Sequence, residues 1–153
     1  MNLSTSLLAL ALLTSTLPAC GVCGSEKLVE KARSQRVIAS NEMGKGQRET
    51  LQQLKLVGES EAVIWYYDRT VTGSGSEGNL LTTKRIVSYR NRDVFEAAFP
   101  DIRSASHESG GTSERIRVEK SSGEFVVLQF GLGADSKRMY ESLCQKIEGK
   151  CKK

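Results

Sequence analysis

The residues best suited to acid–base or nucleophilic chemistry stand together at Ser106-His107-Glu108-Ser109, and His107 is the only histidine in the chain. By type, this tetrapeptide offers a nucleophile, a base and an acid. Adjacent residues on a strand point to opposite faces, so these side chains cannot form a catalytic relay among themselves. A distant serine or aspartate could still join His107, but no nucleophile elbow marks one. We therefore expect no enzyme activity.

A second chemical motif is the glycine-rich run Gly73-Ser74-Gly75-Ser76-Glu77-Gly78, which matches the GxGxxG pattern of dinucleotide-binding loops. That pattern binds a pyrophosphate only when a helix follows at once, because the helix N-terminus holds the anion. Here the following residues, Asn79 to Val87, form a β-type run, and Glu77 would repel phosphate. The motif predicts the flexible tip of a β-hairpin, and we expect no cofactor.

The cysteines and acidic residues indicate no metal site. Cys20 and Cys23 form a CxxC pair, but a thioredoxin-like redox motif opens a helix in a βαβ unit, whereas this pair follows an apolar segment. The aspartates lack the spacing of a calcium loop. Cys144 and Cys151 are seven residues apart across a predicted helix end at Gly149, so an exported chain permits a disulfide between them. Two free thiols, or a pair that includes Cys23, are the alternatives.

Length and charge limit the class of protein. With 153 residues and 39% apolar content, the chain has room for one domain and a targeting segment. A net charge of +4 is too small for a dedicated nucleic-acid binder, so we expect no nucleic-acid partner. Four cations gather near one predicted strand and are candidate contacts for an anionic partner: Lys84, Arg85, Arg90 and Arg92. The alternative is an ordinary solvated polar face.

The N-terminal segment predicts export. No charged side chain occurs from Met1 to Gly24, and Leu7 to Leu13 is an apolar run of secretory-signal length, too short to span a bilayer. The tetrapeptide Leu17-Pro18-Ala19-Cys20 resembles the lipobox of bacterial lipoproteins. This resemblance implies a signal peptide over residues 1–19 and acyl chains on Cys20, which would anchor the protein to a membrane of the cell envelope. A secreted or periplasmic protein, cut for example after Gly21, is the alternative.

The densest β signal lies between Glu61 and Arg90 and predicts one long hairpin. We expect a first arm from Ala62 to Val71, in which odd and even positions are both largely apolar. The second arm, from Leu80 to Tyr89, has the mixed composition of a strand with one solvated face. Trp65 is expected in the core, and an exposed ligand-stacking tryptophan is the alternative.

Helical periodicity occurs on both sides of the strand-rich region. Residues Gln47 to Val57 place leucines and valine on one face, so we expect an amphipathic helix that ends at Gly58. Near the C-terminus, Asp135 or Ser136 can cap a final helix. Its apolar stripe consists of Met139, Leu143 and Ile147. Further strands are expected at Val94–Phe99, Ile102–His107, Glu114–Glu119 and Glu124–Phe130.

The run from Glu59 to Arg90, and within it Leu81-Thr82-Thr83-Lys84-Arg85-Ile86, resembles the opening of bacterial pleckstrin-homology-like domains. The resemblance covers residues 58–147. It implies an α+β domain in which an antiparallel bent sheet, or partly open barrel, is closed by a C-terminal helix. We expect four parts: a signal peptide at 1–19, a lipidated N-terminus with tether and short helix at 20–58, the domain at 59–149, and a basic tail at 150–153.

Together these features predict a non-catalytic, membrane-anchored interaction module of the cell envelope. Its expected partner is an unidentified envelope protein that binds a sheet edge or groove. The alternative is an anionic lipid or cell-envelope polymer that binds the basic face.

Overall fold

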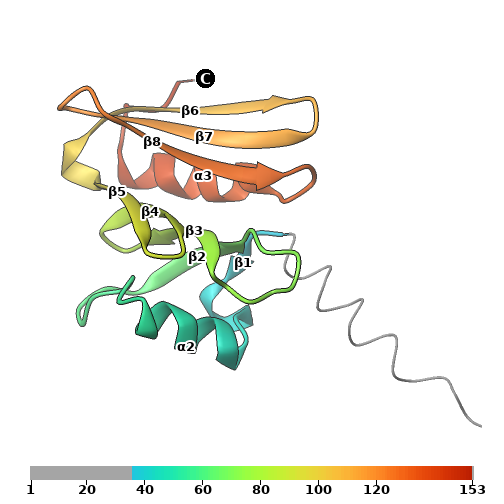
Figure 1. The fold of residues 1–153 in the computed structure, drawn as a ribbon. Coiled ribbons are helices and arrows are strands. Elements are labelled where there is room, and N and C mark those ends of the chain that lie inside the picture. Colours follow the sequence, from blue (N-terminus) through green and yellow to red (C-terminus); the bar gives the residue numbers. More distant parts are fainter. Residues whose placement is uncertain (1–35, 153) are drawn as a thin grey trace, which may run out of the picture.

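A computed structural model describes residues 36–152 of the chain (Figure 1). The predicted signal peptide, Cys20 and the tether up to residue 35 lie outside the described residues. The strands are β1 (Ile38–Ala39), β2 (Val63–Asp68), β3 (Glu77–Thr82), β4 (Arg85–Arg90), β5 (Asp93–Ala98), β6 (Ile102–Gly110), β7 (Ser113–Lys120) and β8 (Phe125–Gly131). The helices are η1 (Ser40–Glu42), α2 (Lys45–Gln53), η2 (Phe99–Asp101) and α3 (Ser136–Lys146).

The described strands form two separate antiparallel sheets. Sheet A has the order β1-β2-β3-β4-β5, and sheet B has the order β6-β7-β8. Figure 1 shows α2 on one side of sheet A, with α3 and sheet B on the other side. The α+β class, the antiparallel strands and the C-terminal helix are therefore confirmed. The two sheets do not close into a barrel.

Sheet A is buried on both faces. Leu80 and Val87 pack on the α2 side with Leu51 of that helix. The neighbouring residues Leu81 and Ile86 belong to the second cluster, which holds the inner residues of sheet B and the apolar face of α3. This two-sided burial explains why the first predicted arm is apolar at odd and even positions alike.

The predicted second arm is wrong, because Leu80 to Tyr89 is divided into β3 and β4 by a tight turn. Thr82 makes this turn. Its hydroxyl oxygen accepts the backbone N–H groups of Lys84 at 3.1 Å and Arg85 at 3.0 Å. A threonine that bonds the backbone two or three residues ahead offers the chain an alternative to the strand ladder. Of the polar residues in the predicted arm, Thr83 and Lys84 lie in the turn, and Thr82 and Arg85 are the strand ends that flank it.

The first arm is also shorter than predicted and ends at Asp68 instead of Val71. The Asp68 carboxylate accepts the N–H of Thr70 at 2.8 Å and the N–H of Gly75 at 3.0 Å. These bonds turn the chain out of the strand and hold both ends of the following loop. The glycine-rich run is the tip of a hairpin, as predicted, although Glu77 and Gly78 already belong to β3.

Helix α2 begins and ends earlier than predicted. It covers Lys45–Gln53, and Lys55 has a left-handed conformation with φ of 53°. The N–H groups of Lys55 and Leu56 bond back to the last turn of the helix, at 3.0 Å each. This reversal buries Leu56, which lies beyond the end of the helix.

The apolar stripe of α3 is confirmed, since Met139, Leu143 and Ile147 are all buried in the main core. The predicted cap is not formed. Asp135 has a left-handed conformation and its side chain makes no capping hydrogen bond. A side chain of sheet B caps the helix instead, because the Glu114 carboxylate on β7 accepts a hydrogen bond from the Ser136 N–H at 3.3 Å.

Trp65 is half-buried and packs against the edge of the main core. Its indole N–H donates to the Ser142 hydroxyl at 2.7 Å, and the Arg138 guanidinium lies 5.3 Å from its ring centroid. A register irregularity between Val63 and Trp65 interrupts the pairing of β2 with β3 at this point. Trp65 therefore joins β2 to α3 at the surface.

Two buried tyrosines make the stability of sheet A sensitive to alkaline pH. The Tyr89 hydroxyl lies 2.8 Å from the Gly75 carbonyl oxygen and 3.5 Å from the Tyr66 hydroxyl. Both side chains are at most 1% exposed, and burial raises the pKa of each phenol well above the ordinary 10.0. The native state therefore keeps two protons that the unfolded chain releases above pH 10.

Above pH 10, we expect the free energy of unfolding to fall by about 1.4 kcal/mol per pH unit for each of these two tyrosines. Urea unfolding measured between pH 9 and 11.5 will give this slope. Tyr89→Phe should remove about half of it. If the double variant Tyr66→Phe/Tyr89→Phe keeps the slope of the natural chain, the buried phenols are not its cause.

Candidate functional site

The structure joins His107 to a distant serine. His107 Nε2 lies 2.8 Å from the Ser136 hydroxyl oxygen, and that hydroxyl also donates to the Glu114 carboxylate. Ser136 is completely buried, so a substrate has no path to its oxygen. The His107 ring lies 5.6 Å from the Tyr140 ring on α3. This chain of contacts ties β6 and β7 to the first turns of α3.

The glycine-rich loop is explained by the close packing of strands. Gly73 and Gly75 both have positive φ, and they form the irregular part of the loop. Gly78 lies in β3 against β2, where an added Cβ would come within 2.5 Å of the Tyr67 carbonyl oxygen and 2.9 Å of the Tyr89 hydroxyl. The third glycine of the motif thus permits the two strands to pair.

Residues 36–152 contain neither a cluster of metal-ligating side chains nor a membrane-spanning helix. This part of the chain contains no group of three or more histidine, cysteine or acidic side chains that could hold a metal ion. Within the same range, no helix is both long and apolar enough to cross a bilayer.

The four candidate cations do not form one patch. Lys84 and Arg85 stand where β4 begins, and Arg90 and Arg92 stand where it ends. A six-residue strand separates these two ends by about 17 Å. Lys84 Nζ donates to the Ser60 hydroxyl at 2.5 Å, and Arg90 pairs with Glu77 at 3.0 Å. The basic run in the sequence is therefore divided in space.

The contacts of Arg85 give it a structural role. Its Nε and Nη2 each lie 3.0 Å from an oxygen of Glu61, and Nη2 also donates to the Leu56 carbonyl at 3.3 Å. A further ion pair joins Arg85 to Glu96 on β5. Arg85 therefore links β4 to the segment before β2 and to the edge strand, and little of its charge is left for an external anion.

Glu61 is the buried partner in this network, with a side chain that is 5% exposed. Burial acts to raise the pKa of Glu61, but hydrogen bonds from Arg85, Thr82 and the Gly58 N–H outweigh it, and the net pKa is lowered. A carboxyl with a lowered native pKa stabilises the fold at neutral pH. That stabilisation is lost as the pH falls from about 4.5 through the native pKa.

Replacing Arg85 with alanine should lower the free energy of unfolding at pH 7 by about 3 kcal/mol or more, because Glu61 is then buried without its partner. Urea unfolding will measure the change. Arg90→Ala is the matched control, since Arg90 is 69% exposed and its pair with Glu77 should contribute at most about 1 kcal/mol. Equal losses in the two variants would contradict a structural role for Arg85.

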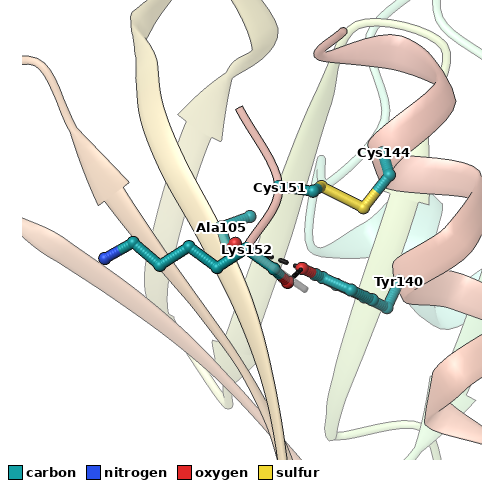
Figure 2. The surroundings of a disulfide bond; sticks show 5 residues. All are labelled: Ala105, Tyr140, Cys144, Cys151 and Lys152. Carbon is teal, nitrogen blue, oxygen red and sulfur yellow. Dashed lines mark hydrogen bonds between the residues drawn. A yellow bond between two sulfur atoms is a disulfide. The ribbon is translucent and has the colours of Figure 1, made fainter. Parts of the chain in front are cut away.

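Cys144 and Cys151 are joined by a disulfide in the structure (Figure 2). The bond holds the C-terminal residues against β6, where the Ala105 N–H donates to the Lys150 carbonyl and the Lys152 N–H donates to the Ala105 carbonyl. The Tyr140 hydroxyl lies 2.7 Å from the Lys152 carbonyl oxygen and 3.2 Å from that of Ala105. Residues 150–152, expected as a basic tail, thus add a short parallel pairing to sheet B.

Two surface features were not identified from the sequence. The first is the edge strand β5, where Val94 is 43% exposed and Phe95 is 57% exposed. The second is a polar cleft between the loop after β2 and the neighbouring ends of β7 and β8, lined by Arg69 and Arg115. An exposed phenylalanine on a predicted strand resembles a core residue in sequence. The cleft joins segments about fifty residues apart, so local patterns could not predict it.

Comparisons with protein-family models, curated proteins and solved structures give no match to this chain.

Proposed function

We propose that this chain is a non-catalytic interaction module of the bacterial cell envelope, whose β5 edge receives an extended segment of a partner protein. The single observation that carries this proposal is the exposed apolar pair Val94 and Phe95 on the edge strand of sheet A. An added strand gains main-chain hydrogen bonds from such an edge, and side chains on either face provide specificity.

The position of the pair on β5 supports strand addition. Val94 lies opposite Tyr89 and Phe95 lies opposite Ser88, so the two side chains point to opposite faces of sheet A. A partner strand alongside β5 could therefore contact one of them on each face. Soluble proteins usually protect an edge with lysine, proline or a bulge, and an apolar edge is open to pairing with another chain.

A photo-crosslinking residue at position 95 should capture a discrete partner in the native envelope, whereas one at position 49 on α2 should not. The double change Val94→Lys/Phe95→Lys should abolish binding of the captured partner. Phe125→Lys is the matched control, because Phe125 is a comparably exposed phenylalanine (47%) on β8, in sheet B. Full binding by the double variant, or equal loss in the control, would remove the β5 proposal.

Ionic strength distinguishes this proposal from the alternative, an anionic lipid or polymer bound by Lys84, Arg85, Arg90 and Arg92. Strand addition should change little between low and high salt, whereas binding to exposed cations weakens steeply. The alternative has the weaker support, because these cations are divided between the two ends of β4 and two of them are already paired with carboxylates.

We propose a pleckstrin-homology-like arrangement for the domain. It is supported by the consecutive strands β2 to β5 in one sheet, the consecutive strands β6 to β8 in a second sheet, and the helix α3 that follows them. An experimental structure with all seven strands in one flat sheet would contradict it.

We also propose that Cys20 carries the lipid that anchors the module, which rests on the lipobox-like Leu17-Pro18-Ala19-Cys20. Cells grown with labelled palmitate should label the natural chain, and Cys20→Ser should lose both the label and the membrane fraction. Cys23→Ser is the control and should keep both. An unlabelled natural chain would show that export proceeds by another cut.

A further inference from the structure

A cleft of about 600 Å³ opens beside the loop that follows β2. Its walls come from residues 67–71, from residues 112–115 where β7 begins, and from residues 129–132 where β8 ends. Its volume is in the range of small-molecule sites, and hydroxyl, amide and guanidinium groups contribute much of its lining. None of these residues belongs to β5, so the cleft is separate from the edge proposed above.

Two arginines of this cleft neighbour Gln129, one through a hydrogen bond and the other through strand pairing. Arg69 Nη2 donates to the Gln129 side-chain oxygen at 3.0 Å. Gln129 is the cross-strand partner of Arg115, so these two side chains lie on the same face of sheet B. Both guanidinium groups therefore belong to the surroundings of Gln129, although the two arginines are far apart in the sequence.

These two positive charges lack counter-ions in the described part of the chain. Among residues 36–152, no carboxylate lies within 4.0 Å of either Arg69 or Arg115, whereas Arg85, Arg90 and Arg103 each have an acidic partner. Glu108 lies opposite Arg115 in the sheet but forms no ion pair with it at that distance. Two unpaired guanidinium groups that line one recess raise its positive potential and attract an anion.

Asp68 is the one carboxylate among the residues that line the cleft, and both of its oxygens accept hydrogen bonds from the loop. It is 2% exposed, one oxygen accepts the Thr70 N–H at 2.8 Å and the Thr70 hydroxyl at 2.5 Å, and the other accepts the Gly75 N–H at 3.0 Å. These bonds fix the segment that carries Arg69. The opposite wall is fixed as well, because the Gly131 N–H donates to the Tyr67 hydroxyl at 2.8 Å.

We propose that this cleft binds a small oxyanion, a carboxylate or a phosphate, held between Arg69 and Arg115. The N–H groups of a guanidinium are spaced to bond the paired oxygens of a carboxylate or of a phosphate. The hydroxyls of Thr112 and Ser113 stand in the same cleft and can bond polar groups elsewhere on the ligand. Val71 and Leu132, which are 68% and 67% exposed, add an apolar rim.

The test uses the full chain, purified in detergent, and two probes: citrate for the carboxylate class and inorganic pyrophosphate for the phosphate class. Calorimetric titration at low salt should show saturable binding of at least one probe, and glycerol should show none. Arg69→Gln and Arg115→Gln should each weaken that binding by about tenfold or more, as expected for a lost charged hydrogen bond. The probe that binds more tightly shows whether the cleft prefers a carboxylate or a phosphate.

Arg103→Gln is the matched control, since the Arg103 side chain is 69% exposed and lies outside the cleft, so the change should leave the affinity within about twofold. Thermal unfolding of each variant will show whether the fold is intact. The proposal is overturned if neither probe saturates the protein at about 10 mM, or if Arg103→Gln weakens binding as much as the two cleft variants do.

Discussion

The fold depends on the burial of both faces of sheet A. Strand β3 is its centre, and from Gly78 to Thr82 every residue is buried. One face needs α2 and the segment around Leu56 as its cover, and the other needs sheet B with α3. A polar group inside such a layer is costly without a partner in the protein, because water cannot reach it. Thr82, Asp68 and Glu61 avoid this cost by bonding turn backbones or Arg85. The side-chain oxygen of Asn79 on β3 is an exception, since it has no partner among residues 36–152.

The same constraint explains which parts of the fold were predictable. Strands β7 and β8 have one buried and one solvated face, and their alternating sequence predicted them to within about a residue. The stripe of α3 was equally clear, since one helix face meets the core. Sheet A has no solvated face along its central strands, so its sequence lacks alternation and predicts a strand across the turn between β3 and β4. Thr82 has a high β propensity, but its side-chain hydrogen bonds form the turn.

The candidate sites were harder to predict, because neighbours in sequence and neighbours in space differ most in antiparallel sheets. Lys84, Arg85, Arg90 and Arg92 are close in sequence, yet a strand holds them apart. Arg69 and Arg115 are distant in sequence, yet each is placed beside Gln129, by a side-chain hydrogen bond or by strand pairing. The run of basic residues in the sequence therefore predicts one basic face, whereas the strand places these residues at its two ends. The pairing register, which sequence patterns do not determine, is what brings the cleft together.

The edges of the two sheets are treated differently, and this difference bears on function. The β6 edge of sheet B is covered near Ala105 by residues 150–152, which the disulfide and Tyr140 hold in place. The other edge strand of sheet A is the short β1, which pairs with β2. On the β5 edge, no strand from residues 36–152 pairs alongside Val94 and Phe95, and β8, the second edge strand of sheet B, also carries the exposed Phe125 and Val127. Protection by the chain's own residues is therefore shown only at β6. The proposed strand addition rests on the general rule that an open apolar edge can pair with another chain.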